Sequence, residues 1–326
     1  MGVDVRDRRT LAAFVAAILV GGANSVAVRS SNAELAPFWG AALRFIGAGL
    51  IFWLLVAVLR IPLPRGRALL GPLIYGVLAF ALSYAFVYFG LKEAHAGPAQ
   101  VILAVVPLLT MLLAVAQRQE RFSARGLGGA LVAAAGIAII FGDQLGGSTP
   151  LVSLLALLAG AALIAETGIV IKAFPRTDPM IMNAVGMSVG VVLLLGLSAA
   201  TGERWALPVK TDTWLALGYL VVFGSVVVFT LVLRVLRAWS ASAASYQFLL
   251  VPLVTILVAA ALIGELPTPI FLLGGAVVLL GVYIGAFSRR AGTESTDVPA
   301  ASSVESPAGA RVAVAYTVVP PPAGNC

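Results

Sequence analysis

The stretch Val106-Pro107-Leu108-Leu109-Thr110 returns 145 residues later as Val251-Pro252-Leu253-Val254-Thr255. Aligned without gaps at this offset, residues 97–141 and 242–286 share 14 identical residues in 45 pairs. An apolar composition alone produces chance matches of Ala, Leu and Val. The other matches are harder to obtain by chance, and they lie in register: Glu120 with Glu265, Gly129 with Gly274, and Gly136 with Gly281. We therefore interpret the two stretches as copies of one internal repeat.

The composition around this repeat decides the class of protein. Of the 326 residues, 60% are hydrophobic and only 11% are charged, and the mean hydropathy is +1.03. A soluble domain carries about 25% charged residues, so soluble, fibrous and disordered classes are excluded. The apolar residues come in runs of about 20, which is the length of a membrane-spanning helix and not of a barrel strand. The sequence predicts an all-α integral membrane protein.

Apolar runs separated by charged residues or by Pro and Gly predict ten transmembrane helices. Their approximate ranges are 10–29, 36–59, 68–90, 97–117, 125–142, 150–172, 179–199, 213–235, 243–263 and 268–288. The repeat offset equals five spans, an odd number, so the second copy is expected to lie inverted in the membrane, as in many secondary transporters. The prediction is two inverted five-helix repeats, 1–145 and 146–290, followed by a disordered cytoplasmic tail, 291–326.

Lys and Arg are distributed unevenly between the loops of the two sides. One set of loops carries fifteen, namely Arg6, Arg8, Arg9, Arg60, Arg65, Arg67, Arg118, Arg121, Arg125, Lys172, Arg176, Arg234, Arg237, Arg289 and Arg290. The other set carries four, namely Arg29, Lys92, Arg204 and Lys210. Cytoplasmic loops carry the excess, so both termini are predicted to be cytoplasmic in the plasma (inner) membrane. The basic residues behind the net charge of +7 thus lie in loops, where they indicate the orientation of the spans. We therefore expect no nucleic-acid partner. The first span also resembles a secretory signal peptide, which leaves nine spans as an alternative.

Residues that support catalysis or metal binding are scarce. The lone cysteine, Cys326, and the lone histidine, His95, cannot build a disulfide framework or a His/Cys metal site. Gly126 to Gly129 opens a span and is not followed by Lys-Ser/Thr, so it is a helix-packing series and not a phosphate-binding loop. We expect no metal, no other cofactor and no ATP hydrolysis.

Several motifs resemble a known family. Gly22-Ala23-Asn24-Ser25-Val26-Ala27-Val28-Arg29 is similar to the Gly-x-Asn-Phe-x-x-x-Lys opening of the EamA family in the drug/metabolite transporter superfamily, with Ser25 and Arg29 as departures. Arg44 matches the arginine of that family's second span. Pro107 to Arg121 and Pro252 to Glu265 match the proline, apolar stretch and Gly-Glu-like end of its repeated module. The resemblance covers residues 10–288. It implies a ten-helix carrier with both ends cytoplasmic, a central cavity and export of small metabolites.

Two charged residues lie well inside predicted spans, Arg44 in the second and Glu166 in the sixth. An ionised residue near the bilayer centre costs roughly 2.5 to 3.5 kcal/mol on insertion scales, so such residues are usually paired, solvated or functional. The alternatives are snorkelling of Arg44 to the outer headgroups and a purely structural carboxyl at Glu166. Both are candidate cavity residues.

Uncharged polar residues supply weaker candidates. Phe80, Tyr84 and Tyr88 are spaced to form one stripe on the third span, which suits either packing or a wet cavity. The remaining candidates for the cavity are Asn24, Gln100, Asn183, Tyr246 and Gln247, each of which could instead bond a neighbouring helix. Ser123 and Thr268-Pro269 are placed as helix caps.

Pro107 and Pro252 fall near the middle of the fourth and ninth predicted spans. Each proline removes one backbone hydrogen bond and bends its helix. A packing kink explains one such proline, whereas two at matched positions also suit a hinge or exposed carbonyls beside a cavity.

These features together favour a secondary transporter that exports small metabolites, such as amino acids or related compounds, by alternating access around a central cavity. Its partners would be the substrate, the lipid bilayer and, through Glu166, a coupled proton. An uncoupled facilitator is the alternative within transport. A membrane-embedded enzyme acting on lipid would need acids or histidines clustered at one depth, and a scaffold would not need paired prolines.

Overall fold

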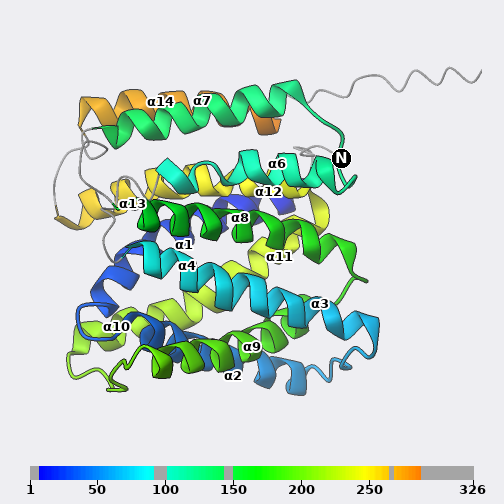
Figure 1. The fold of residues 1–326 in the computed structure, drawn as a ribbon, viewed down its shortest axis with the longest axis vertical. Coiled ribbons are helices and arrows are strands. Elements are labelled where there is room, and N and C mark those ends of the chain that lie inside the picture. The colour runs from blue at the N-terminus through cyan, green and yellow to red at the C-terminus, as the bar shows by residue number, and fades with distance from the viewer. Residues whose placement is uncertain (1–6, 92–100, 143–149, 264–267, 288–326) are drawn as a thin grey trace, which may run out of the picture. The chain divides into compact units, whose positions relative to one another are not determined.

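A computed structural model of the chain describes residues 7–91, 101–142, 150–263 and 268–287. Regular structure in these ranges is helical, without a β-strand, and includes three π-helical segments (η). In chain order the elements are α1 (Arg8–Ser31), α2 (Pro37–Val58), α3 (Arg67–Tyr75), η1 (Gly76–Leu82), α4 (Ser83–Leu91), α6 (Val106–Ala116), α7 (Ala124–Ile140), α8 (Leu151–Ala173), α9 (Pro179–Ala200), α10 (Thr211–Val221), η3 (Val222–Val227), α11 (Val228–Ala238), α12 (Ala241–Ser245), α13 (Gln247–Ile263), α14 (Pro269–Val282) and η4 (Tyr283–Phe287) (Figure 1). The predicted tail, 291–326, lies outside the described residues.

Seven helical segments in the described ranges are long and apolar enough to cross a membrane. Three shorter apolar segments accompany them: Val101–Ala116, Ala124–Ile140 and Pro269–Gly285. Each of the ten predicted ranges overlaps one of these ten segments. The all-helical membrane class is therefore confirmed, whereas the count of ten spans stays a prediction.

Local sequence explains where several helices begin. The Ser123 hydroxyl accepts a hydrogen bond from the Gly126 amide at 3.1 Å and caps α7, as predicted. At the corresponding place in the second copy, the Thr268 hydroxyl accepts from the Phe271 amide at 3.2 Å and caps α14. Pro269 occupies the first turn of α14, where its missing N–H costs nothing.

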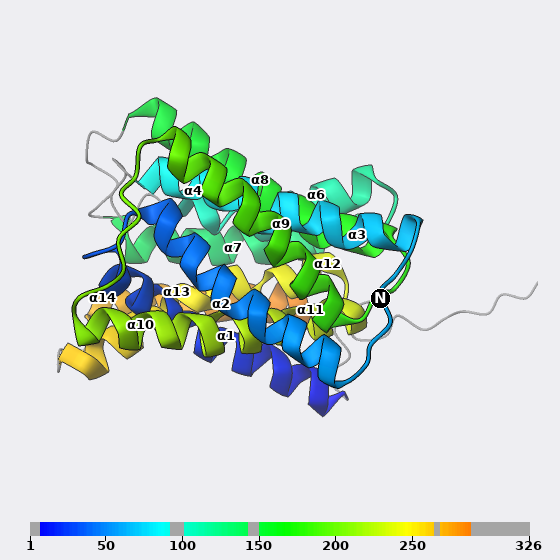
Figure 2. The same ribbon diagram turned by 90° about the horizontal axis from the view of Figure 1, so that it is seen from below.

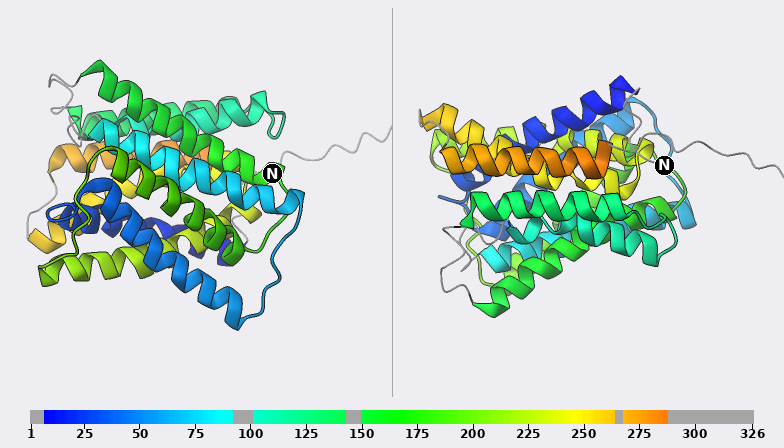
Figure 3. Two further views of the ribbon diagram at one scale, coloured as in Figure 1. Left: turned by 60° about the horizontal axis from the view of Figure 1, so that its bottom comes forward. Right: turned by 90° about the horizontal axis from the view of Figure 1, so that it is seen from above.

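The helices α7 and α14 lie side by side at one edge of the bundle, and α2 and α9 lie at the opposite edge (Figure 1). A Cβ added to Gly129 would lie 2.6 Å from the Gly281 carbonyl oxygen, and the reverse substitution gives the same distance. Gly136 and Gly274 oppose each other at 2.7 and 2.8 Å in the same way. The contacts run in opposite directions along the two helices, so α7 and α14 are antiparallel (Figure 3). Gly129 and Gly274, and Gly136 and Gly281, are partners at the 145-residue offset.

Other structural details also recur at the 145-residue offset. The π-segments η1 and η3 cover 76–82 and 222–227, within one residue of that spacing. The Thr110 hydroxyl donates to the Val106 carbonyl at 2.8 Å, and the Thr255 hydroxyl donates to the Val251 carbonyl at 3.1 Å. Helix contacts follow the same rule, because α1 packs on α13 and α8 packs on α6. Similarity between the halves thus extends beyond the stretch that is alike in sequence.

The bundle has two distinct ends. Figure 2 shows α2 and α10 beginning at the same end, beside the loop that joins α9 to α10. The loop before α9 lies at the other end, since its Thr177 hydroxyl donates to the Ala68 carbonyl at the start of α3 at 3.4 Å. The 22 residues of α9 connect the two ends over about 33 Å.

Candidate functional site

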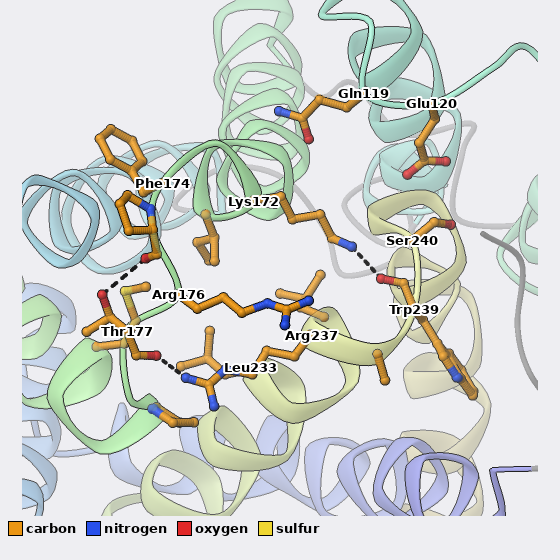
Figure 4. A pocket seen from close by; sticks show the side chains of 16 residues that line it. Gln119, Glu120, Lys172, Phe174, Arg176, Thr177, Leu233, Arg237, Trp239 and Ser240 are labelled. Carbon is orange, nitrogen blue, oxygen red and sulfur yellow. Dashed lines mark hydrogen bonds between the residues drawn. The ribbon is translucent and has the colours of Figure 1, made fainter. Parts of the chain in front are cut away.

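A pocket of about 310 Å³ lies between helix ends, at the end of the bundle where α9 begins (Figure 4). It is lined by the loop after α6, the end of α8, the loop into α9, the end of α11 and the residues before α12. The lining residues are Gln119, Glu120, Ile171, Lys172, Phe174, Pro175, Arg176, Thr177, Pro179, Met182, Leu233, Leu236, Arg237, Ala238, Trp239 and Ser240. Its volume is at the lower end of the range for small-molecule sites.

Helix ends and caps position these side chains. Helix α8 ends at Ala173, and α9 begins at Pro179 after Asp178, whose carboxylate accepts from the Met180 amide at 2.8 Å. Helix α11 ends at Ala238, and the Ser240 hydroxyl caps α12 by accepting from the Ala243 amide at 3.1 Å. The sharp turns between these helices carry the lining residues into the space between the helix ends.

Two cations tie the walls of the pocket together. The Lys172 ammonium donates to the Trp239 carbonyl, which links α8 to the turn before α12. The Arg237 guanidinium donates to the Thr177 carbonyl, which links α11 to the loop before α9. Figure 4 shows both bonds, together with the bond from the Thr177 hydroxyl to the Pro175 carbonyl at 3.3 Å. The rim therefore consists of loops held by side chain to backbone bonds.

In the sequence, Lys172, Arg176 and Arg237 contribute only to the orientation count, and no motif marks them as one site. The available signal was that all three flank loops on the same predicted side as Glu120. The structure brings these four side chains to one pocket.

Arg44 lies inside the bundle, with its side chain 3% exposed. Its Nε donates to the Ser225 hydroxyl and its Nη2 to the Gly224 carbonyl, both at 2.7 Å. The guanidinium also lies 5.4 Å from the centre of the Phe45 ring. Arg44 thus bonds the π-segment η3 from a buried position.

Asn24 of α1 lies beside the same π-segment. Its Oδ1 is the atom that a Cβ on Gly224 would meet, and this buried oxygen has no hydrogen-bond partner among the described residues. The structure therefore brings together two of the predicted cavity residues, Asn24 and Arg44, around Gly224.

The predicted aromatic stripe joins a larger cluster. Phe80 of η1 is fully buried, and the centre of its ring lies 4.9 Å from that of Phe45 in α2. The ring of Tyr84 in α4 lies 5.0 Å from the same Phe45 ring. Phe229 of α11 completes the cluster with Phe80 at 4.9 Å. Tyr88 lies in α4, and its side chain is outside the described part of the structure.

The other polar candidates are spread over different helix contacts. The Tyr75 hydroxyl donates to Asn183 Oδ1 at 3.3 Å, and Asn183 is fully buried. The Tyr246 hydroxyl donates to the Gly126 carbonyl at 2.9 Å and joins the turn between α12 and α13 to α7. Gln247 is half-buried at the start of α13, and Gln100 lies outside the described residues.

Glu166 lies on the face of α8 that meets the end of α6. Gln117 Nε2 donates to both carboxylate oxygens of Glu166, at 2.8 Å each. Arg44 and Glu166 therefore bond to different helices, and within the described ranges neither is the other's partner.

The two candidate hinge prolines differ in their surroundings. Pro107 lies in the first turn of α6, after a break in the helix at residues 104–105. Pro252 lies inside the continuous helix α13. The helix interruption nearest to it is at Tyr246, between α12 and α13.

The opposite end of the bundle is fastened by two glutamates, Glu34 and Glu203, which we call the glutamate latch. Glu203 accepts from the Phe38 and Trp39 amides at 3.2 and 2.9 Å. Glu34 accepts from the Lys210 amide at 3.2 Å. The rings of Trp39 and Trp205 stack at 5.2 Å beside the latch.

The apolar helices and the solute-sized pocket between their ends are features of a multi-span helical membrane protein with a small-molecule site. The chain belongs to the EamA-like transporter family, whose model matches residues 9–142 and 151–286.

Named relatives are similar in sequence over most of their length. One is an uncharacterized inner membrane transporter of Escherichia coli, YedA, 26% identical over 83% of this chain and 89% of the relative. A second E. coli protein, named a probable amino-acid metabolite efflux pump, is 26% identical over 84% of this chain and 93% of its own. A probable terminal-alkyne amino-acid exporter of Streptantibioticus cattleyicolor is 27% identical over 68% of this chain and 74% of the relative. A solved crystal structure shares the fold, with a TM-score of 0.71 at 20% identity over 85% of this chain and 98% of that chain.

Proposed function

We propose that this protein is a secondary exporter of the inner membrane that takes up small metabolites, such as amino acids, from the cytoplasm and releases them outside. One observation carries the proposal: a pocket lies between the helix ends at the basic end of the bundle, while the other end is fastened by the glutamate latch. Basic loops mark the cytoplasmic side, so the pocket would face the cytoplasm. Such a state accepts solute from inside.

Alternating access would use two inverted repeats, 1–145 and 146–290, in a frame of ten spans with both termini cytoplasmic. Three observations support this frame: the reciprocal glycine contacts of α7 and α14, the matched π-segments, and the paired helix contacts at the 145-residue offset. The transition to an outward-facing state would open the latch and close the pocket.

The solute path between the ends would pass the polar side chains inside the bundle. Arg44 and Asn24 are the best supported of these, because they meet at the π-segment η3, where regular helical bonding is altered. Tyr84 and Tyr88 would line the path from the same half of the chain, and Asn183 would line it from the other half. Gln100, Tyr246, Gln247 and Glu166 stay as further candidates.

Reporter fusions test the frame. A fusion after residue 290 and one in the 60–67 loop should report cytoplasm, and a fusion near residue 205 should report the outside. A cytoplasmic signal at residue 205 would contradict both the ten-span frame and the inverted repeat.

Transport in everted inner-membrane vesicles tests the activity. The name of the E. coli relative, a probable amino-acid metabolite efflux pump, makes amino acids the first solutes to test. Everted vesicles expose the cytoplasmic face, so an exporter should accumulate labelled solute in them and an empty-vector control should not. A panel of amino acids, nucleosides and cationic dyes that yields no accumulation above the control would overturn the proposal.

A further inference from the structure

The pocket carries more positive charge than negative charge. Lys172, Arg176 and Arg237 line it, and Glu120 is its one carboxylate. Two positive charges are therefore uncompensated within the lining. A site of this kind attracts anions and repels cations, most strongly where its low-dielectric walls focus the field.

The hydrogen bonds of the cations leave most of their donors available. Lys172 and Arg237 bond to the main-chain carbonyls of Trp239 and Thr177, which carry no net charge. Arg176 makes no hydrogen bond or ion pair within the described part of the chain. Its guanidinium extends into the middle of the pocket in Figure 4. Arg176 is exposed to solvent, so the five N–H donors of its planar fork are open to a ligand that enters the pocket.

Two acids lie close enough to act on these cations, Glu120 on Lys172 and Asp178 on Arg237, so three cations face two acids. Glu120 accepts from the Ser242 amide at 3.2 Å, which turns one of its oxygens toward α12. Asp178 lies outside the lining and caps α9 through the Met180 amide. The orientation rule explains why these loops are basic, but it does not require three cations to converge on one pocket without a matching number of acids.

We propose that the pocket is a binding site for small dicarboxylates, including acidic amino acids, and that Arg176 is its principal ligand group. One carboxylate would bind the Arg176 guanidinium through two parallel hydrogen bonds. The second would bind the remaining ammonium donors of Lys172. Leu233, Leu236 and Met182 supply the apolar wall for the carbon chain between the carboxylates.

This inference rests on the proposed function, because it names the class of solute that the exporter would take from the cytoplasm. An anionic lipid headgroup offers similar oxyanion chemistry. The lining comes from five segments at the ends of different helices, so the pocket lies between helices, and this favours a soluble ligand over a lipid.

The experiment measures binding of succinate, glutamate, glutamine and lysine to the purified full-length protein by calorimetry. Succinate and glutamate should bind at least about tenfold more tightly than glutamine, and lysine should not compete. Arg176→Gln should weaken succinate binding by about tenfold, a loss typical of one charge-assisted pair. Arg176→Lys, which keeps the charge but not the fork, should lose less. Arg121→Gln is the matched control, since Arg121 is an exposed cation of the neighbouring loop outside the lining.

Equal binding of the four solutes, or equal loss in the Arg176 and Arg121 variants, would overturn the inference. A lipid in the pocket would make the protein more stable in phosphatidylglycerol nanodiscs than in phosphatidylcholine nanodiscs, and succinate would not change its stability. This result too would overturn the inference. Everted-vesicle transport of neutral amino acids that survives in Arg176→Gln would leave the exporter proposal standing. If the wild-type protein transports none of the tested solutes, the proposed function itself is contradicted.

Discussion

Glu34 and Glu203 each cap the helix that follows the other glutamate in the sequence. Glu34 precedes α2 but accepts from the Lys210 amide at the start of α10, whereas Glu203 precedes α10 but accepts from the Phe38 and Trp39 amides at the start of α2. Each carboxylate lies at the positive end of the other helix's dipole. The reciprocity fastens α2 to α10, which belong to opposite halves of the chain.

Glu203 should contribute more to this fastening than an ordinary surface acid. Glu203→Ala removes three acceptor bonds, including one from the Ser198 hydroxyl at 2.7 Å, and should lower the free energy of unfolding by about 1 kcal/mol. Asp212→Ala is the control, because Asp212 lies in the first turn of α10 outside the latch. Chemical unfolding in detergent measures both. Equal losses in the two variants would show that only general charge at the helix start matters.

Glu34 should make this end of the protein sensitive to acid. Hydrogen bonds from the Thr213 hydroxyl and from the Lys210 and Val209 amides hold the pKa of Glu34 below its ordinary value of 4.5. Because the folded-state pKa is lowered, the stabilisation is present above pH 4.5 and is lost as the pH falls through the lowered value. Glu34→Gln should flatten this part of the stability–pH curve, measured by thermal unfolding. The effect should be small and salt-dependent, since Glu34 is partly exposed to solvent. An unchanged slope in the variant would count against it.

Adjacent glycines of α7 should respond in opposite ways to the same substitution. A Cβ at Gly128 would meet nothing within 4 Å, so Gly128→Ala should be neutral or stabilise by up to about 1 kcal/mol through helix propensity. A Cβ at Gly129 would lie 2.6 Å from the Gly281 carbonyl oxygen, so Gly129→Ala should destabilise by about 1 to 3 kcal/mol. Thermal unfolding of the two single variants compares them. Similar melting temperatures would mean that α7 and α14 are not in close contact in the membrane.

Features encoded locally could be predicted from the sequence. Ser123 and Thr268 were predicted as caps, because a cap depends on a side chain and the backbone three residues on. The apolar runs gave the helix positions for a similar reason. The glycine contacts of α7 and α14 could be predicted only in part. The sequence shows Gly129 and Gly274 as equivalent positions of the repeat, but it does not show that the two glycine-bearing helices pack against each other.

Features that depend on pairing between distant residues could not be predicted. The latch joins residues about 165 positions apart, and no local pattern distinguishes Glu203 from any other loop acid. Arg44 is recognisable as an unusual charge in a span, but its partners, the Ser225 hydroxyl and the Gly224 carbonyl, are about 180 positions away and carry no distinctive local pattern. The pocket cations were indistinguishable from orientation charges until the helix ends were placed in space.

The paired prolines are expected to matter for the rate of transport and not for insertion. Pro107 follows a helix break and Pro252 lies inside α13, so the two substitutions to alanine should have unequal effects if local backbone bonding is the cause. Each variant should lower transport in everted vesicles while membrane levels stay at wild type. Wild-type transport in the double variant would assign both prolines to packing.

Glu166 offers the sharpest test of proton coupling. Its carboxylate accepts from Gln117 Nε2 through both oxygens, so protonating one oxygen would replace an acceptor by a donor and weaken the contact between α8 and the end of α6. Protonation would thereby be linked to helix packing, which coupled exchange requires. As a hypothesis, Glu166→Gln should abolish the dependence of transport on a pH gradient and leave exchange at equal pH largely intact. Gln117→Leu removes the donor and keeps the carboxyl, so it should weaken gradient dependence as well, because protonation of Glu166 is then no longer linked to the contact between α8 and α6. If Glu166→Gln responds to the gradient as wild type does, Glu166 is not the coupling residue, and the uncoupled facilitator becomes the better description of this transporter.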